Sequence, residues 1–174
     1  GREHTLASRG YELTMLSLLK QNCESPGQDE AWLRALHMVA ASMLPFADSE
    51  TATQALDSVL PPGCRQQRSP AVLAWFDLYR SIAERNMSAM SHAAKSVVEA
   101  DDSVTEVQRA YALSAAMLGQ LCSSRGADAL ALWEGRTNHF GKVDATPEIK
   151  LILAVARDPN GSALCSGSGH SALR

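Results

Sequence analysis

Two stretches of this chain, 69–100 and 104–135, have the pattern of helical hairpins whose landmark residues recur 36 positions apart. The matching positions pair Trp75 with Tyr111, Ala93 with Ala129 and Val97 with Trp133. A unit of two short helices buries its apolar face only by stacking on neighbouring units. The repeat therefore predicts an all-α chain whose stacked hairpins form an extended binding surface rather than a catalytic pocket.

The composition agrees with one helical domain. The chain has 174 residues, of which 45% are hydrophobic, which is enough for a single core but not for two. Aromatic residues make up only 5%, and the expected helices are rich in alanine, leucine and serine, which favours closely packed helices over a β-sandwich. We expect one domain over residues 1–157 and a flexible tail over 158–174, where proline, glycine and serine are frequent.

Start and stop signals divide the domain into helices. A first helix over 3–22 ends at the Ser25-Pro26-Gly27 break, and Asp29 is expected to cap a second helix that Pro45 bends or ends. A third helix follows Asp48 and stops before Pro61, so that residues 29–60 make a first hairpin.

The later helices have equally local signals. Ser69-Pro70 and Thr146-Pro147 each place a capping side chain before a proline at the first helical position. Ser103-Val104-Thr105-Glu106 fits a capping box, with Ser103 as the cap. The adjacent pair Asp101-Asp102 is expected to cap this junction rather than to bind a cation.

The four cysteines, Cys23, Cys64, Cys122 and Cys165, show no C-x-x-C spacing. The sequence therefore predicts reduced thiols, without a zinc cluster or a disulfide framework. The uncharged runs 35–47 and 110–124 are shorter than the ~20 residues that cross a bilayer. We expect a soluble, intracellular protein without a membrane span. The start of the chain does not resemble a secretory leader, and a targeting segment that has been removed remains an open alternative.

The hairpin 69–100 resembles a degenerate tetratricopeptide repeat. The resemblance depends on Trp75, Leu78, Tyr79 and Ile82, followed by a second helix rich in small residues that ends at 97–101. Tyr79 stands where a small residue is usual, and Ile82 replaces the second aromatic residue. Over about residues 29–135, the resemblance implies a right-handed superhelix of three hairpins. Its concave groove, lined by the first helix of each hairpin, would hold a partner peptide or helix, and flanking terminal helices would cap the stack.

A second interpretation is RNA binding. The segment 129–134 is similar to part of a pentatricopeptide repeat, a class that binds single-stranded RNA. The formal net charge of −3 at pH 7 disfavours a nucleic-acid groove. An RNA-binding repeat, or a peripheral subunit of a ribonucleoprotein complex, is therefore the alternative to a protein partner.

Four arginines are the candidate partner-binding residues. Arg65 and Arg68 lie in the polar connector before the fourth helix, and Arg80 and Arg85 lie on that helix. Together they could present a basic surface to an acidic peptide or a phosphate backbone. The alternative is that they are ordinary solvated surface charges.

No catalytic, cofactor or metal site is expected. His37 and His92 each lack the histidine or carboxylate four residues on that a helical metal site needs, so both are interpreted as structural. Cys122 and His139 could form a thiolate pair, but a packing cysteine and a loop histidine explain them more simply.

The three tryptophans are expected in the core rather than on a binding surface. The predicted core residues are Leu36, Trp75, Leu78, Ile82, Val97, Met117, Leu121 and Trp133.

The sequence favours a non-enzymatic protein interaction module, such as a scaffold, adaptor or assembly chaperone, that binds a partner segment on a concave helical face. An all-helical enzyme would need a closed pocket with a perturbed titratable group, which the scattered histidines and cysteines do not indicate. Oligomeric state and biological process are not readable from the sequence.

Overall fold

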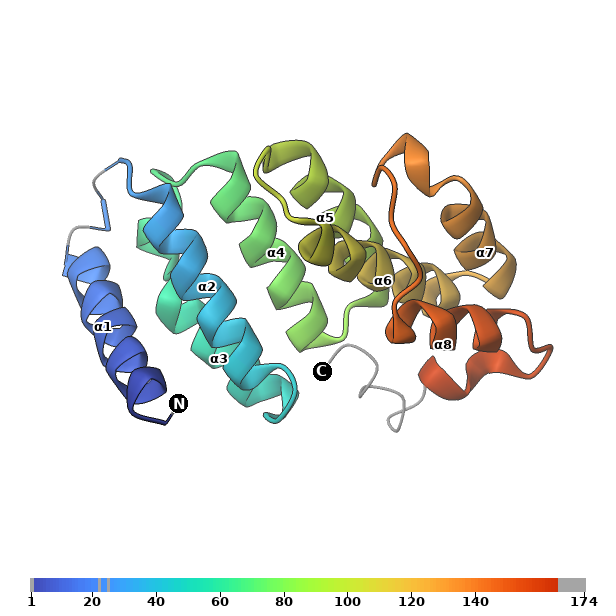
Figure 1. Cartoon of the computed structure of the whole chain (residues 1–174), viewed down its shortest axis with the longest axis horizontal. Coiled ribbons are helices and arrows are strands. Elements are labelled where there is room, and N and C mark those ends of the chain that lie inside the picture. The colour runs from blue at the N-terminus through green and yellow to red at the C-terminus, as the bar shows by residue number, and fades with distance from the viewer. Residues whose placement is uncertain (1, 22, 25, 166–174) are drawn as a thin grey trace.

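The computed structural model describes residues 2–21, 23–24 and 26–165 of the chain (Figure 1). All regular structure in these residues is helical, which confirms the all-α prediction. The α-helices are α1 (Arg2–Gln21), α2 (Asp29–Met43), α3 (Ser49–Val59), α4 (Pro70–Glu84), α5 (Met87–Ala100), α6 (Glu106–Ser123), α7 (Gly126–Glu134) and α8 (Pro147–Ala156). Short 3-10 helices cover Pro62–Cys64, Arg136–Asn138 and Gly161–Cys165. None of the helices described is both long and apolar enough to cross a membrane.

Several helices begin where the local sequence predicts. Asp48, Ser69 and Thr146 each accept a hydrogen bond from the backbone N–H three residues on, and Pro70 and Pro147 take the first helical position of α4 and α8. These interactions involve only neighbouring residues, so the sequence pattern is sufficient to predict them.

The predicted capping box is shifted by two residues. Thr105, not Ser103, is the N-cap of α6, and Gln108 completes the reciprocal pair. Ser103 is engaged elsewhere, since its backbone N–H and hydroxyl both donate to Oδ1 of Asp101, at 3.0 and 2.8 Å. The expectation that Ser103 caps α6 is wrong because the Asp101 carboxylate holds Ser103 in the preceding turn.

The start of α2 also differs from the prediction. Asp29 is the first helical residue, and the N-cap is Gln28, whose φ of 59° is left-handed and whose side chain makes no capping bond. Asp29 lies in the first turn, where its carboxylate interacts favourably with the positive end of the helix dipole.

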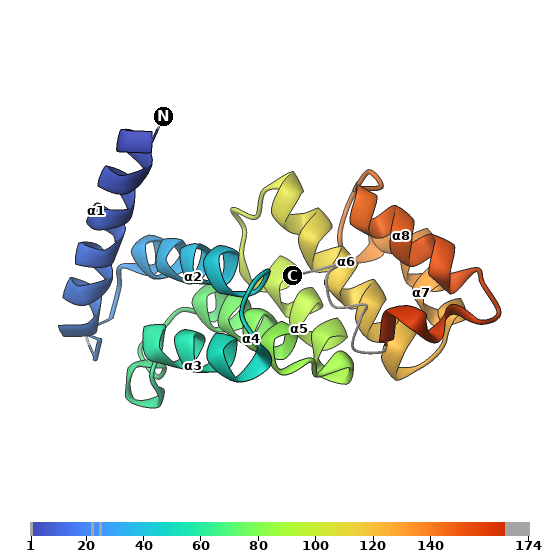
Figure 2. The same ribbon diagram turned by 90° about the horizontal axis from the view of Figure 1, so that it is seen from below.

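The helices pack in sequential pairs along the molecule. α2 packs on α3, α4 on α5 and α6 on α7, and neighbouring pairs are joined by contacts of α4 with α2 and α3 and of α5 with α6. α1 packs on α2 at one end, and α8 packs on α6 and α7 at the other. Figure 2 shows α1 standing at an angle to the rest of the array.

The core largely follows the sequence prediction. Leu36, Trp75, Leu78, Ile82, Val97 and Met117 are buried, whereas Leu121 and Trp133 are only partly buried. The connector 135–145 reads as a polar linker, yet it places the fully buried Phe140 and Val143 in the core. Two apolar side chains are too few to form a periodic pattern, so sequence periodicity missed them.

The contact between α5 and α6 is close enough to require glycine. A Cβ atom added at Gly119 of α6 would lie 2.6 Å from the carbonyl oxygen of Met87 and 3.2 Å from the backbone nitrogen of Ser91. The two backbones approach each other at this point because Gly119 has no side chain.

The cysteines are paired, so the prediction of reduced thiols is wrong. Disulfides join Cys23 to Cys64 and Cys122 to Cys165, with Cα atoms 4.9 and 5.2 Å apart and sequence separations of 41 and 43. Each bridge encloses a pair of helices, α2 and α3 in the first and α7 and α8 in the second. A helix pair returns the chain to the end where it began, so cysteines distant in sequence meet without any short spacing.

The disulfides bear on two further expectations. Disulfides form and persist in oxidising compartments, so the cysteines give no support to the expectation of an intracellular protein. The bridge from Cys165 also attaches the 3-10 helix Gly161–Cys165 to α6. The described start of the expected tail is thus linked to the domain, and residues 166–174 lie outside the described part of the chain.

Candidate functional site

One cavity is lined by the first helices of all three predicted hairpins. It has a volume of about 220 Å³ and lies between α2, α4 and the start of α6. Its lining residues are His37, Ala40, Ala41, Leu44, Pro45, Trp75, Tyr79, Val107, Gln108 and Tyr111. This volume is below the roughly 300–1,000 Å³ of pockets that hold whole small ligands, and it suits a single side chain. We call this cavity the aromatic pocket.

Aromatic rings in mutual contact form one wall of the aromatic pocket. The His37 ring meets Trp75 and Tyr79 edge-on, with centroids 4.7 and 5.7 Å apart. Trp75 and Tyr79 are 5.4 Å apart, and Tyr79 and Tyr111 are 6.2 Å apart. The repeated pair Trp75 and Tyr111 therefore contributes to one site, at equivalent places on α4 and α6.

A hydrogen-bonded chain fixes the histidine. Oε1 of Gln108 accepts from the backbone N–H of Thr105 at 3.0 Å, which turns the amide Nε2 toward Nε2 of His37, 3.4 Å away. The Gln108 amide can only donate in this contact, so we assign the ring proton of His37 to Nδ1. Nδ1 then donates to the Tyr79 hydroxyl oxygen at 2.6 Å.

The titratable groups that line the aromatic pocket are neutral at pH 7. Burial lowers the pKa of His37 below its usual 6.5, and the nearby Asp101 only partly opposes that shift. Burial also raises the pKa of Tyr79 and of Tyr111 well above that of a free phenol. A second proton on His37 would also face the donating amide of Gln108, which disfavours the imidazolium further.

A buried carboxylate lies behind this wall. Nε1 of Trp75 donates to Oδ2 of Asp101 at 2.8 Å, and Asp101 is only 6% exposed. Burial raises the pKa of Asp101, but the hydrogen bonds from Trp75 and Ser103 outweigh it and leave the pKa below 3.8. Asp101 is therefore ionised at neutral pH. The expected role of Asp101 as a helix cap is replaced by that of an anchor for Trp75.

Apolar side chains are exposed at and near the mouth of the aromatic pocket. Val107, which lines it, is 80% exposed, and Phe46, next in sequence to the lining residue Pro45, is 86% exposed. Large exposed apolar side chains beside a concave aromatic site are typical of surfaces that contact a partner.

The four predicted arginines lie away from the aromatic pocket. Arg65 and Arg80 converge on Oδ1 of Asp57, at 3.1 and 3.4 Å. Arg80 also pairs with Glu84 at 2.8 Å, and Arg65 stacks on the Phe76 ring at 4.5 Å. The structure thus brings two of the four together through intrachain contacts.

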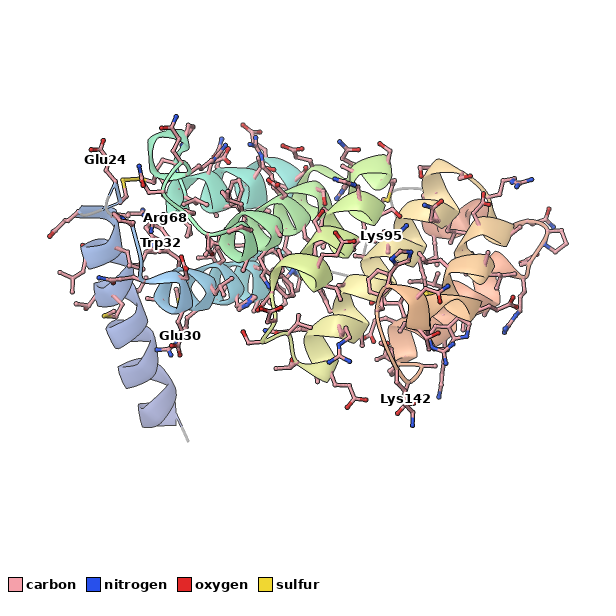
Figure 3. The ribbon with its side chains drawn as sticks, turned by 90° about the horizontal axis from the view of Figure 1, so that it is seen from above. Glu24, Glu30, Trp32, Arg68, Lys95 and Lys142 are labelled. Atoms are coloured by element: carbon pink, nitrogen blue, oxygen red, sulfur yellow. A yellow bond between two sulfur atoms is a disulfide. The ribbon has the colours of Figure 1, made fainter. Side chains whose placement is uncertain are left out.

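The other two arginines have opposite environments. Arg68 is 6% exposed, donates to the carbonyl oxygens of Cys23 and Gly27 at 2.9 and 3.3 Å, and lies over the Trp32 ring at 4.8 Å. Figure 3 shows Arg68 and Trp32 close together, at the same end of the molecule as Glu24. Arg85 ends α4 in a left-handed conformation, with φ 58°, and is exposed. A joint binding surface of the four arginines remains an untested prediction.

Two further cavities differ in character. One, of about 350 Å³, is a mainly apolar groove between α1, α2 and α3 that includes Leu13, Met38 and Val59. The other, of about 470 Å³, lies between α4 and α5; Arg80 and Glu84 in its lining pair with each other, and Asp77 lines it as well. Neither is shared by three helix pairs.

The considered thiolate pair is not formed. Cys122 is bonded to Cys165, and His139 is exposed. Within the described ranges, no group of three or more histidine, cysteine, aspartate or glutamate side chains is placed to hold a metal ion.

Sequence reasoning found part of the aromatic pocket and missed the rest. The 36-residue spacing of Trp75 and Tyr111 indicates that the two residues occupy equivalent places, but the sequence predicts Trp75 only as a core residue. His37 and Gln108 lie 71 residues apart and carry no local motif. Only the tertiary packing brings α2 and the start of α6 to the same cavity.

Comparisons with protein-family models, with curated proteins and with solved structures find no match to this chain.

Proposed function

We propose that this protein is a non-enzymatic interaction module that binds a segment of a protein partner in the aromatic pocket and along the adjoining faces of α2, α4 and α6. In this proposal the three helix pairs form a tetratricopeptide-like solenoid, and their first helices line its concave side. α1 and α8 cap the two ends of the stack.

The observation that supports this proposal best is the composition of the aromatic pocket wall. Ala41, Trp75 and Tyr111 come from three different helix pairs and line one cavity. A site shared by successive units is the usual way in which stacked repeats bind an extended or helical segment. Aromatic residues in a concave site are also the residue type that dominates the energetics of protein interfaces.

The aromatic pocket favours a protein partner over RNA. No arginine or lysine lines the cavity, and a nucleic-acid groove needs positive charge along its length. Arg65 and Arg80 belong to the basic surface that the sequence predicts, and both pair with Asp57.

A peptide-display selection tests the proposal. Ala41 is exposed and lines the aromatic pocket, so the A41F substitution would fill the mouth of the cavity with little effect on the core. A131F is the matched control, because Ala131 is an exposed helical alanine of α7 outside the pocket.

We expect peptides selected on the wild-type chain to bind A131F unchanged and to lose at least ten-fold in affinity for A41F. Equal binding to both variants would place the binding surface elsewhere and overturn the proposal. Affinity for RNA that falls steeply with salt, with no selected peptide, would support the ribonucleoprotein alternative.

A further inference from the structure

The aromatic pocket combines aromatic faces with a buried negative charge. Tyr79 and the partly exposed Tyr111 contribute rings, and the ionised Asp101 is hydrogen-bonded to the fully buried Trp75. The face of an aromatic ring carries partial negative charge and attracts cations within about 6 Å of the ring centre. Both features favour a positive guest over a neutral one of the same shape.

In the described part of the chain, Asp101 has only neutral hydrogen-bond donors. Its three hydrogen bonds come from the neutral donors Trp75 Nε1, Ser103 N–H and Ser103 hydroxyl. None of the ion pairs in the described part of the chain includes Asp101. Its field reaches the pocket wall, where it acts on the titration of His37.

Acidic side chains lie in the segment that leads into α6. Glu106 is next in sequence to the lining residue Val107, Asp102 lies in the turn before α6, and both are exposed, whereas Arg109, next to Gln108, has its guanidinium beside Gly141. The nearest cation on α2 is Arg34, one turn before His37, and it pairs with Glu30 at 3.3 Å.

The remaining wall of the aromatic pocket is aliphatic. Ala41, Leu44, Pro45 and Val107 face the cavity and offer contact to a hydrocarbon stem. A lysine-type side chain has this division, with an apolar stem below a compact charge.

We infer that the aromatic pocket receives an ammonium group on an aliphatic stem, presented by a basic segment of a protein partner, with the Tyr79 and Tyr111 rings and the Asp101 carboxylate as its counter-charge. The aliphatic wall contacts the stem, and Asp102 and Glu106 attract the flanking basic residues. This inference rests on the proposed function, whose site it shares.

The first experiment compares two small probes of equal shape. Choline carries a quaternary ammonium, and 3,3-dimethylbutan-1-ol is its neutral isostere. Binding is followed by NMR shifts of the His37 and Tyr111 ring signals during millimolar titrations. We expect choline to bind at least ten-fold more tightly, with an affinity that falls as salt is raised. Equal or tighter binding of the neutral alcohol, or no binding of either probe, would overturn the cationic anchor.

A second experiment uses peptides that differ only at one position, occupied by lysine or by norleucine. We expect the lysine peptide to bind more tightly to the wild-type chain and D101N to reduce this preference about ten-fold, a difference of about 1.4 kcal/mol. Because D101N could disturb the fold, Y111L and Y111F form an independent pair. Y111L removes one aromatic face and is expected to weaken the preference, whereas Y111F retains the ring and is expected to retain the full preference.

The outcomes separate the two proposals. If the norleucine peptide binds as well as the lysine peptide and A41F abolishes both, the cationic anchor is wrong and the pocket proposal stands with an apolar anchor. If A41F leaves the binding of both peptides unchanged, the proposed function itself is wrong. Equal preference for lysine in Y111L and Y111F would also overturn the cationic anchor.

Discussion

The indole of Trp75 donates a hydrogen bond to the carboxylate of Asp101 across 2.8 Å, and both residues are buried. The same carboxylate holds Ser103 in the turn that precedes α6. α6 in turn presents Val107, Gln108 and Tyr111 to the aromatic pocket. One buried contact therefore connects the core of α4 with the position of the proposed binding site.

Removing the indole N–H should weaken this connection. W75F retains an aromatic ring but leaves Asp101 with one donor fewer, and we expect a loss of about 1–3 kcal/mol in the free energy of unfolding. W75A also creates a cavity and should cost about 3–5 kcal/mol. Urea unfolding measures both. W133F is the control, because Trp133 is partly exposed, and an effect of W133F as large as that of W75F would contradict this role of the indole.

His37 should make stability depend on mildly acidic pH. Burial lowers its pKa in the folded state below 6.5, so the unfolded chain binds more protons below that pH. Its contribution to stability is fully present above pH 6.5 and is lost as pH falls toward the lowered pKa. H37Q should remove this dependence below pH 6.5 in urea titrations, and an unchanged slope would refute the assignment. Asp101 has a lowered pKa, so its contribution to stability is present above about pH 3.8 and is lost only as pH falls below that value; the two effects are therefore separable.

Two glycines should respond in opposite directions to the same substitution. G119A places a Cβ atom 2.6 Å from a backbone oxygen of α5, and we expect clear destabilisation, of about 1–3 kcal/mol, from the overpacked contact. G10A adds a methyl group to α1 where nothing lies within 4 Å, and it should stabilise by about 0.5–1 kcal/mol through helix propensity. Thermal unfolding of both variants checks the pair, and stabilisation by G119A would rule out the close approach of α5 and α6.

Each disulfide should contribute measurably to stability. Closing loops with sequence separations of 41 and 43 restricts the unfolded chain, and typical contributions are about 2–4 kcal/mol per bridge. We expect C23S/C64S and C122S/C165S each to lower the melting temperature. A chain without cysteines should be insensitive to a reducing agent, whereas the wild-type chain should lose stability in it. Free thiols detected in the oxidised, folded wild type would contradict both pairings.

Substitutions of Arg68 and Arg85 should have very different effects on stability, although the sequence predicts both residues in one binding surface. Arg68 is buried, and its guanidinium bonds two carbonyl oxygens of the connection between α1 and α2. R68M removes these bonds and should destabilise by about 1–3 kcal/mol. Arg85 is exposed, and R85A should stay within about 0.5 kcal/mol of the wild type. Chemical unfolding of the two variants tests the contrast, which would fail if R68M were as mild as R85A.

Helix boundaries were the most predictable part of this protein. Ser69 with Pro70, and Thr146 with Pro147, mark helix starts through bonds that span three residues. Interactions of such short range depend little on the rest of the chain. The apolar stripe of α4 likewise identified Trp75, Leu78 and Ile82 as core, because a helical period of 3.6 residues places them on one face.

The sequence alone thus determined the helical class, most helix starts and much of the core, all of which follow from neighbours along the chain. The tertiary structure decided the pairing of the cysteines and the hydrogen bond of Ser103 to Asp101 in place of a helix cap. It decided that Arg68 is buried whereas Arg85 is exposed. It also decided the aromatic pocket, in which His37 and Gln108 meet across 71 positions. These features depend on which ends and faces of the packed helix pairs come together, and no local spacing encodes that information.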